Sequence, residues 1–520
     1  MGKKEGLIES TIISTIGSLA TRTLGMITGV FICNKIGAEG TGVYQLMMTI
    51  YYLSYMFASA GIITAVSKLV SEAISKGWGV RAKKLMNSFF RMGIVMSGIM
   101  SAGLFLYAHP ISVWILRDTR SIMGLKVLAF SIPFMTLSAC YKGYFYAVQK
   151  VIKPVSAEIF EQMVKLVLIG MLLTAWGEQG IGYGCAAIAL GIVIGEILSF
   201  LYLGMLYLGD TSMRNNRRIA GLREPSPIWS ILKVVTPLAI GAYIGGSLGM
   251  VENIIIPHGL KASGLDNVEA LSAYGMIKGM VMPLIFFPTA FLAAGATILI
   301  PEIAKAKTLK WDGRIENLTN RVMHFTMILA MFIMSIYSIY GKELGLVMYH
   351  NPHVGKFIQM LVIIIPFAYV EMMLDGILKG LGEQNSCLIY RIIDSVFRVL
   401  LMYFLIPIRG INAVIFVSIF MSIVTVWMMI HRLKQVTGFR MQWAKWINYP
   451  ILSALAATMV SRVFMERLFP RNIAFNIKVI LALISAGVLY IIFLMLLESL
   501  TKEDLKVFRR TRHVEASRRS

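Results

Sequence analysis

Charged residues and cysteines are scarce in this sequence. Asp, Glu, Lys and Arg make up 15% of the 520 residues, while hydrophobic residues make up 57% and the mean hydropathy is +0.72. An ordinary soluble protein of this length does not have such a composition, so the sequence predicts an all-α polytopic membrane protein. The four cysteines lie singly in or beside apolar runs, and this spacing argues against a zinc site or a disulfide framework.

Acidic residues are also few. There are 27 of them against 50 lysines and arginines, which gives a formal net charge of +23. Such a charge could indicate nucleic-acid binding, but in so apolar a chain we expect the basic residues to concentrate in cytoplasmic loops and to fix the orientation. We interpret the basic tail at 501–520 as an orientation signal or a contact with anionic membrane lipids, and expect no nucleic-acid partner.

Motifs of catalysis and of cofactor binding are absent as well. No Gly-x-x-x-x-Gly-Lys-Ser/Thr loop occurs, which argues against ATP hydrolysis by this chain. The histidines are scattered, and His350 and His353, which are close in sequence, have no carboxylate or cysteine beside them. The sequence therefore predicts no enzyme, no metal site and no cofactor, and transport by this chain would have to use gradients.

Long apolar runs are what the sequence has in abundance. About 14 of them reach the length of ~20 residues that a membrane-spanning helix needs. If both termini are cytoplasmic, the inside loops hold roughly three times as many lysines and arginines as the outside loops, as the positive-inside rule predicts. We therefore expect a multi-pass protein of the cell membrane with both termini in the cytoplasm. The runs lie near 10–33, 42–68, 87–108, 122–148, 154–175, 181–208, 229–256, 272–300, 319–341, 356–379, 384–407, 411–431, 446–466 and 474–498.

A polar segment and internal repeats divide the chain into two halves. Leu24-Gly25-Met26 recurs as Leu248-Gly249-Met250, and Ile132-Pro133-Phe134 recurs as Ile365-Pro366-Phe367. Internal repeats are common in transporters, whose substrate sites lie at the repeat interface. The predicted parts are a six-helix lobe at 1–208, a cytoplasmic linker at 209–228, a second six-helix lobe at 229–432, two additional transmembrane helices at 433–500 and a basic cytoplasmic tail at 501–520.

Arg22 lies near the middle of the first apolar run, which we expect to remain as a span because it lacks a convincing cleavage site. An arginine at the centre of a spanning helix costs about 2.5 to 3.5 kcal/mol on insertion scales, so Arg22 should face protein or a wet cavity. It could pair with a carboxylate or with helix carbonyls. The interpretation that we favour is a cationic group that binds an anion.

Two matched triplets of charged residues follow the repeated Ile-Pro-Phe segments. Spacings of three and four residues place each triplet on one face of a helix. Within each triplet an acid and a base four residues apart could form a structural pair that reduces the cost of burial. Alternatively, the two faces oppose each other across a cavity and supply switchable ion pairs. The triplets are Glu158, Glu161 and Lys165 in the fifth span and Arg391, Asp394 and Arg398 in the eleventh.

Other charged residues are also predicted to lie deep in the spans. Lys278 in the eighth span is followed by Pro283, and a proline frees a backbone carbonyl and permits a bend. Glu252, Glu371 and Asp375 are further deep acids. They are candidates for coupling to a cation, H+ or Na+, or for partners of the nearby basic residues.

Three stretches of the sequence resemble a known family. They are Thr21-Arg22-Thr23-Leu24-Gly25-Met26, Ile36-Gly37-Ala38-Glu39-Gly40-Thr41-Gly42-Val43-Tyr44, and Tyr274-Gly275 with Gly279-Met280-Val281-Met282-Pro283-Leu284. They are similar to the stage V sporulation protein B-like group in the polysaccharide transporter branch of the multidrug/oligosaccharidyl-lipid/polysaccharide exporter superfamily, over essentially the whole chain. The resemblance implies two six-helix lobes in a V shape and alternating access. It also implies export or flipping of a lipid-linked saccharide for cell-wall, spore-cortex or polysaccharide synthesis.

The chain is also similar to the lipid II flippases, whose cavity cations suggest where a substrate would bind. Arg22 matches a cation of their first span and Lys278 loosely matches one of their eighth. Their second-span arginine has no counterpart here, where the chain reads Leu53-Ser54-Tyr55-Met56-Phe57. An undecaprenyl-pyrophosphate saccharide has an anionic head that buried cations would bind. The predicted substrate-binding residues are Arg22, Lys278, Arg391 and Arg398.

Three other functions remain open. A cation-coupled multidrug or organic-cation antiporter of the same fold would favour an unpaired acid in the first half, where the deepest group of the first span is Arg22. A membrane glycosyltransferase or polymerase would need a carboxylate or a histidine in a large outside loop, and the predicted outside loops are short. A scaffold that recruits synthesis enzymes is the third alternative.

Overall fold

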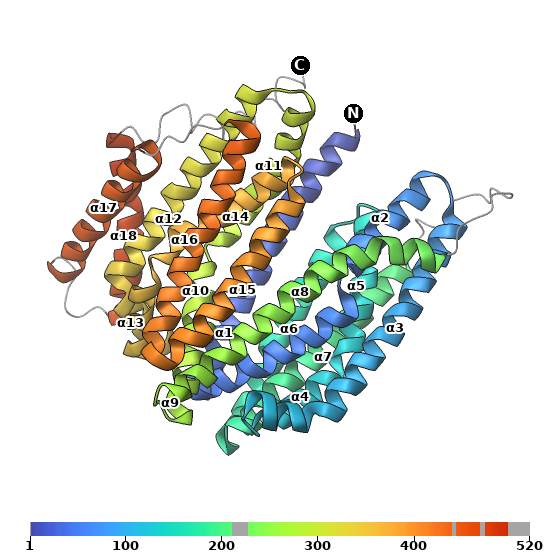
Figure 1. The fold of residues 1–520 in the computed structure, drawn as a ribbon, viewed down its shortest axis with the longest axis horizontal. Coiled ribbons are helices and arrows are strands. Elements are labelled where there is room, and N and C mark those ends of the chain that lie inside the picture. Colours follow the sequence, from blue (N-terminus) through green and yellow to red (C-terminus); the bar gives the residue numbers. More distant parts are fainter. Residues whose placement is uncertain (1, 211–226, 439–443, 468–473, 498–520) are drawn as a thin grey trace. The chain divides into compact units, whose positions relative to one another are not determined.

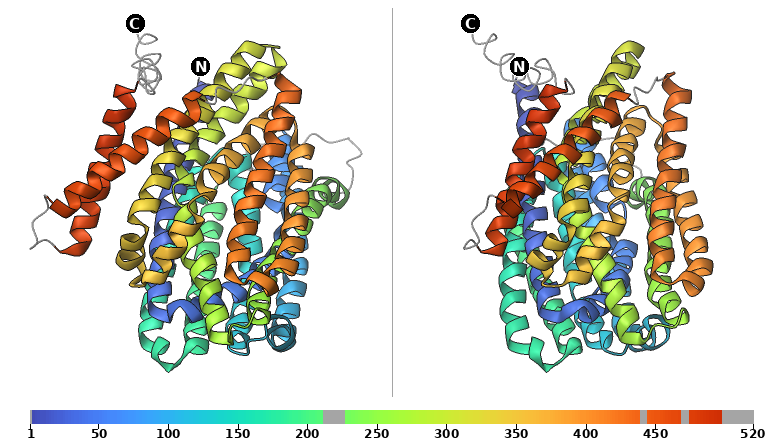
Figure 2. Two further views of the ribbon diagram at one scale, coloured as in Figure 1. Left: turned by 60° about the vertical axis from the view of Figure 1, so that its left-hand side comes forward. Right: turned by 90° about the vertical axis from the view of Figure 1, so that its left-hand side faces the viewer.

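The structure is a computed structural model that describes residues 2–210, 227–438, 444–467 and 474–497. Helices make up 92% of these residues, which contain no strand (Figures 1 and 2). The described chain includes 10 helices long and apolar enough to cross a membrane, or up to 12 if each of two bent helix pairs is one span. The prediction of an all-α membrane protein is therefore confirmed. Most of the predicted linker and the whole predicted tail lie outside the described residues.

The described residues form the following helices in chain order. In the first part of the chain they are α1 (Gly2–Ser59), α2 (Ile62–Ser75), α3 (Gly79–Pro110), η1 (Ile111–Leu116), α4 (Ser121–Ala129), α5 (Ser131–Ala147), α6 (Ile152–Trp176), η2 (Gly177–Gln179) and α7 (Ile181–Leu208). Then come α8 (Pro227–Ala262), α9 (Asn267–Tyr274), η3 (Gly275–Val281), α10 (Met282–Phe286), α11 (Thr289–Thr308), α12 (Asp312–Tyr349), α13 (Pro352–Leu361), α14 (Ile364–Gly380), α15 (Gln384–Arg409), α16 (Ile411–Thr437), η4 (Ala444–Asn448), α17 (Tyr449–Arg467) and α18 (Phe475–Leu496).

The chain groups into two compact units by its internal contacts. Unit 1 comprises Met1–Ala290 and Arg391–Val417, and unit 2 comprises Phe291–Tyr390 and Ser418–Ser520. Each unit therefore combines segments that are far apart in the sequence. The division into lobes at 1–208 and 229–432 stays a prediction.

A break at Gly37 interrupts α1, which has 58 residues. Gly37 has φ 72° and ψ −177°, a backbone conformation that favours glycine because other residues have a Cβ. A straight helix of this length would be about 87 Å long, nearly three times the ~30 Å core of a bilayer. The spans predicted at 10–33 and 42–68 both fall within one apolar stretch, Ile13–Ser75, on the two sides of this break (Figure 1).

The predicted count of 14 spans is not confirmed. The apolar stretch Ile13–Ser75, which contains Gly37, counts as one candidate span where the sequence predicted two. A second is α15, which coincides with the span predicted at 384–407 but is not among the apolar candidates, because Arg391, Asp394 and Arg398 lie close together in it. The span predicted at 272–300 is also divided, into a candidate span at Asn267–Phe286 and the separate helix α11.

Two spans are bent at the repeated Ile-Pro-Phe segments. The angle is 42° between α4 and α5 and 57° between α13 and α14. A proline lacks an N–H, so the carbonyl four residues before it loses its helical partner. The Ser101 hydroxyl donates to such a carbonyl at Ala129, before Pro133, at 2.7 Å. Before Pro366, the carbonyl of Val362 instead accepts a hydrogen bond from the backbone amide of Ile365 at 3.1 Å. A proline at the same place in each repeat thus accompanies the same bend.

Close backbone contacts join α1 to η3 and to the end of α9. A Cβ at Gly42 would lie 2.2 Å from the carbonyl oxygen of Leu271, and a Cβ at Gly275 would lie 2.2 Å from that of Ala38. No side chain fits at either position without movement of the backbone. The two glycines therefore fix how α1 and η3 lie against each other within unit 1.

The last two helices, α17 and α18, form a hairpin that packs against α12 within unit 2 (Figure 2). The rings of Phe332 and Tyr490 stack with their centroids 4.7 Å apart. The Tyr490 hydroxyl also donates to the carbonyl of Ile328 at 2.8 Å, and that of Ser335 donates to the carbonyl of Ala454 at 3.0 Å. Such hydrogen bonds between helices supply cohesion where lipid removes the usual hydrophobic driving force.

Candidate functional site

Arg22 is exposed on the first segment of α1. It makes no hydrogen bond or ion pair with any described residue, so the pairing with a carboxylate that the sequence left open has no partner in the part of the chain that the structure describes. The hydroxyls beside it bond back to their own helix, from Thr21 to the carbonyl of Gly17 at 3.0 Å and from Thr23 to that of Leu19 at 2.8 Å.

Lys278 lies in η3, a π-helical segment, and is paired. Its Nζ lies 2.8 Å from Glu252 Oε1 on α8. Pro283 leaves the carbonyl of Gly279 without its helical partner, and the thiol of Cys33 on α1 donates to that carbonyl at 3.6 Å. Short π-helical segments occur often at functional sites. From the sequence this proline permits a bend, and the structure has a π-helix at Gly275–Val281 with Lys278 paired to Glu252.

The charged residues of α15 form the pair that helical spacing predicts. Arg398 Nη2 lies 3.1 Å from Asp394 Oδ1, four residues earlier. The positive charge of Arg398 also acts on Glu252, so α8, η3 and α15 bring their charges to one region of unit 1. Arg391 is exposed on the same helix.

A second charged cluster is centred on Lys165 of α6. Its Nζ lies 2.6 Å from Glu161 on the same helix and 2.7 Å from Glu196 on α7. Glu158 of α6 pairs with Lys142 of α5 at 3.1 Å. The two carboxylate residues around Lys165 are almost fully buried, at 8% exposed for Glu161 and 3% for Glu196. The i,i+4 pair expected from the sequence is present, and the fold adds a second acceptor to it.

Sequence reasoning missed Glu196 and Lys142. Glu196 is the single charged residue in the run 181–208 and Lys142 is one of two lysines in the run 122–148, and a charge in so apolar a run was the available signal. What the sequence could not show is that α7 brings Glu196 to Lys165. The helices approach closely there, since a Cβ at Gly195 would lie 2.6 Å from Cγ of Lys165.

The other predicted acids lie on α14 in unit 2. Asp375 pairs with Lys379 at 2.6 Å, again four residues apart. Glu371 is half-buried one turn earlier. The structure therefore brings Glu252 together with Lys278 and near Arg398, and it places Glu371 and Asp375 in the other unit.

This charge distribution suits an anionic ligand better than a metal ion. No group of three or more His, Cys, Asp or Glu side chains that could hold a metal occurs among the described residues. Within the described part of unit 1, Glu252 pairs with Lys278 and Asp394 pairs with Arg398, so two of the four cations proposed from the sequence lie beside a carboxylate. That set consists of Arg22, Lys278, Arg391 and Arg398.

Family models match the chain in two adjoining parts. The model of the polysaccharide biosynthesis protein family matches 7–241, and the MatE model matches 260–404. Together they cover the first predicted lobe from residue 7 and the second predicted lobe to residue 404, except for 242–259.

Two relatives from Bacillus subtilis (strain 168) match most of the chain. Stage V sporulation protein B is 24% identical over 408 residues, which are 77% of this chain and 78% of that protein. The lipid II flippase MurJ is 22% identical over 432 residues, 76% of each chain.

Solved structures of transporters share the fold of this chain. Lipid II flippase MurJ in an inward closed conformation aligns with a TM-score of 0.66 at 13% identity, over 94% of this chain and 99% of that chain. A multidrug resistance MATE family transporter in an inward-facing conformation aligns with a TM-score of 0.65 at 13% identity, over 82% and 99%. Together with the family models and the relatives, these matches support a stage V sporulation protein B-like polysaccharide transporter of the multidrug/oligosaccharidyl-lipid/polysaccharide exporter superfamily, and the proteins matched are transporters and not enzymes.

Proposed function

We propose that this protein is a flippase or exporter that moves an undecaprenyl-pyrophosphate-linked saccharide across the cell membrane by alternating access. The saccharide would serve cell-wall, spore-cortex or polysaccharide synthesis. The names of the relatives support this class of substrate. The observation that carries the proposal is Arg22, an exposed cation on a spanning segment without a partner among the described residues.

The physical problem for a flippase is the charged head of its substrate. A pyrophosphate saccharide loses its hydration when it leaves water, and a carboxylate-lined or apolar path would not replace that hydration. Arginine donates two parallel hydrogen bonds to a phosphate, and charge-assisted bonds of this kind are about twice as strong as neutral ones. Arg22 can therefore offset part of the desolvation cost, while the isoprenoid tail remains in lipid.

The paired cations provide a way to bind and then release the head. Lys278 is held by Glu252 and Arg398 by Asp394. A pyrophosphate competes with these carboxylates for the same cations, and the ion pairs re-form when the substrate leaves. We propose that Arg22, Lys278, Arg391 and Arg398 bind the head group. Glu158, Glu161 and Lys165, together with Asp394, act as ion pairs that open and close during the cycle.

The orientation is part of the proposal. Both termini lie in the cytoplasm, and the lobes at 1–208 and 229–432 rock about the substrate. Anionic lipids contact the basic tail at 501–520.

Reconstituted vesicles that contain the intact protein should flip a fluorescent undecaprenyl-pyrophosphate saccharide faster than protein-free vesicles. Lys278→Ala is expected to slow flipping roughly tenfold, because one charge-assisted interaction contributes about 1.5 to 3 kcal/mol and each 1.4 kcal/mol is tenfold. The measurement is the fraction of fluorophore that an outside quencher reaches over time. Lys126→Ala, which removes an exposed cation on α4, is the matched control.

Absence of flipping with any lipid-linked saccharide, together with uptake of an organic cation by the same vesicles, would contradict the flippase assignment. It would favour the antiporter of the same fold. In that case the buried carboxylates become the substrate-binding groups.

Coupling to a cation is expected to depend on Glu252, Glu371 and Asp375. Replacing them singly and together with Gln or Asn should abolish the acceleration of flipping by an imposed H+ or Na+ gradient, because a neutral amide does not attract the cation. The exposed carboxylate of Glu302, which pairs with Arg314 at 2.9 Å, provides the control Glu302→Gln. Full gradient-driven flipping by the triple variant would remove these three acids from the coupling mechanism.

A further inference from the structure

A separate hollow lies in unit 1 at the connection between η1 and α4. It has a volume of about 360 Å³ and is lined by Val113, Arg117, Asp118, Thr119, Arg120 and Asn267. None of the residues proposed above for the substrate head lines it. The predicted orientation places this end of unit 1 outside the cell.

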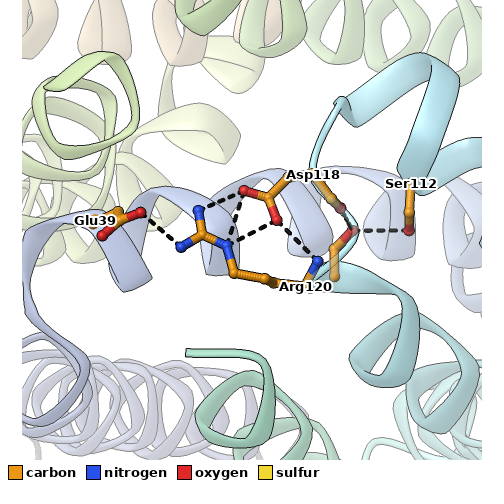
Figure 3. A network of polar contacts seen from close by, with 5 residues as sticks. Glu39, Ser112, Asp118 and Arg120 are labelled. Carbon is orange, nitrogen blue, oxygen red and sulfur yellow. Dashed lines mark hydrogen bonds and ion pairs between the residues drawn. The ribbon is translucent and has the colours of Figure 1, made fainter. Parts of the chain in front are cut away.

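The wall of the hollow is fixed by hydrogen bonds around Asp118 (Figure 3). This buried carboxylate accepts from the backbone amide of Arg120 at 2.9 Å, from its Nε at 3.0 Å and from its Nη2 at 2.7 Å. Glu39, from the segment after Gly37, accepts from Nη1 at 2.6 Å. The hydrogen bonds to Asp118, and then those to Glu39, raise the pKa of the Arg120 guanidinium above its ordinary value, so Arg120 stays charged and held in one position.

Arg117 differs from Arg120 in having no such partners. It is exposed, and its guanidinium makes no hydrogen bond or ion pair with any residue that the structure describes. It follows the π-helix η1 and has φ 53°, in the left-handed region that costs energy for residues other than glycine. Such strained residues and π-helical segments cluster at binding sites.

Lys261 adds a third cation to this region. It lies in the last turn of α8, and its charge interacts with those of Arg117, Asp118 and Arg120. The hollow and its surroundings therefore hold Arg117, Arg120 and Lys261 against the carboxylates of Asp118 and Glu39. Of the charged residues that line the hollow, Arg117 and Arg120 outnumber Asp118, and both Asp118 and Glu39 form their ion pairs with Arg120 and not with Arg117.

Exposed aromatic side chains near the hollow indicate its position relative to the membrane surface. Trp114 of η1 is 77% exposed and Tyr107 of α3 is 63% exposed. Tryptophan and tyrosine concentrate at the membrane–water interface, at the level of the lipid head groups. Because Trp114 lies only three residues before Arg117, the cationic hollow opens at the same level.

We infer that this hollow binds the phosphoryl group of a membrane lipid at the outer interface. Arg117 would provide a bidentate guanidinium and Arg120 its remaining N–H groups, while Asn267 contributes a neutral polar side chain. The hollow is much larger than one phosphate, so a sugar or glycerol attached to the phosphoryl group fits as well. The lipid is either a polyprenyl carrier after transport or an anionic phospholipid. The assignment to the outer leaflet rests on the proposed orientation, whereas the binding chemistry does not rest on the proposed flipping.

The test measures lipid binding by the full chain without measuring transport. Native mass spectrometry of the purified protein would count bound undecaprenyl phosphate and, in a second arm, bound phosphatidylglycerol. Arg117→Asn is the sharpest variant, because asparagine tolerates the left-handed backbone while removing the charge. We expect it to weaken binding of at least one of the two lipids about tenfold, as the loss of one charge-assisted contact predicts. Lys261→Gln should weaken it as well.

Lys126→Gln, an exposed cation on the adjoining α4, is the matched control and should bind both lipids as the unchanged protein does. Weaker binding of undecaprenyl phosphate alone would assign the hollow to the carrier lipid, and equal weakening of both would assign it to phosphoryl head groups in general. Displacement of lipid by inorganic pyrophosphate from the unchanged protein, but not from Arg117→Asn, would support the same chemistry. Equal lipid binding by Arg117→Asn and Lys126→Gln would overturn the inference, whether or not the protein flips lipids.

Discussion

Replacing Lys165 with methionine is expected to lower the free energy of unfolding by roughly 3 to 5 kcal/mol, the cost of breaking a buried ion pair from one side. Glu161 and Glu196 would then face each other in the interior of unit 1 without the cation that holds both at 2.6 and 2.7 Å. The long side chain of methionine fills a similar volume, so the loss would come from charge and not from a cavity. The thermal midpoint in detergent and the yield of folded protein are the measurements.

The triple variant Lys165→Met, Glu161→Gln, Glu196→Gln provides the decisive comparison. Neutral replacement of a whole buried ionic cluster is often tolerated, so most of the lost stability should return. Lys84→Met, at an exposed position on α3, controls for the loss of a lysine. An unchanged midpoint in the single variant would show that Lys165 does not hold the two helices together.

Arg22→Ala is expected to reduce flipping of an undecaprenyl-pyrophosphate saccharide roughly 10- to 100-fold, as loss of a charge-assisted hydrogen-bonding group predicts. The thermal midpoint should stay the same, because Arg22 makes no polar contact with any described residue. Reduced flipping with an unchanged thermal midpoint would distinguish the role of Arg22 from that of Lys165, because replacement of Lys165 should lower the stability. Arg22→Lys should keep part of the activity, since it keeps the charge and loses the bidentate geometry.

Lys233→Ala is the control for Arg22, because Lys233 is also an exposed cation in a spanning helix of unit 1. It should flip the substrate at the rate of the unchanged protein. If Arg22→Ala does so as well, the first span does not bind the head group. Binding of the head group would then depend on Lys278 and on the charged residues of α15.

Local spacing predicted the features that depend on one helix alone. The pairs of Glu161 with Lys165 and of Asp394 with Arg398 follow directly from the spacing of four residues that places side chains on the same face. The apolar runs likewise predicted the helices, because a chain in lipid must satisfy its backbone hydrogen bonds internally. The bends at the two Ile-Pro-Phe segments are also local, since the proline removes a hydrogen bond wherever it occurs.

Features that depend on the packing of several helices could not be predicted. Glu196 reaches Lys165 only because α6 and α7 lie against each other, and no pattern within 181–208 contains that information. The charged hollow near Arg120 joins Glu39 to Asp118, which are far apart in the sequence. In both cases the sequence identifies the charged residues but does not predict which of them are in contact.

Lys278 lies in η3, which packs closely against α1. The two segments of α1 hold η3 from both sides of Gly37, through the thiol of Cys33 at the carbonyl of Gly279 and through the backbone of Gly42 and Ala38 against the end of α9 and Gly275. Sliding of η3 along α1 would bring their backbone atoms into steric clash. In this conformation the packing of α1 against η3 therefore sets the distance between Arg22 and Lys278. A substrate is then selected by the distance between its charged groups as well as by their charge.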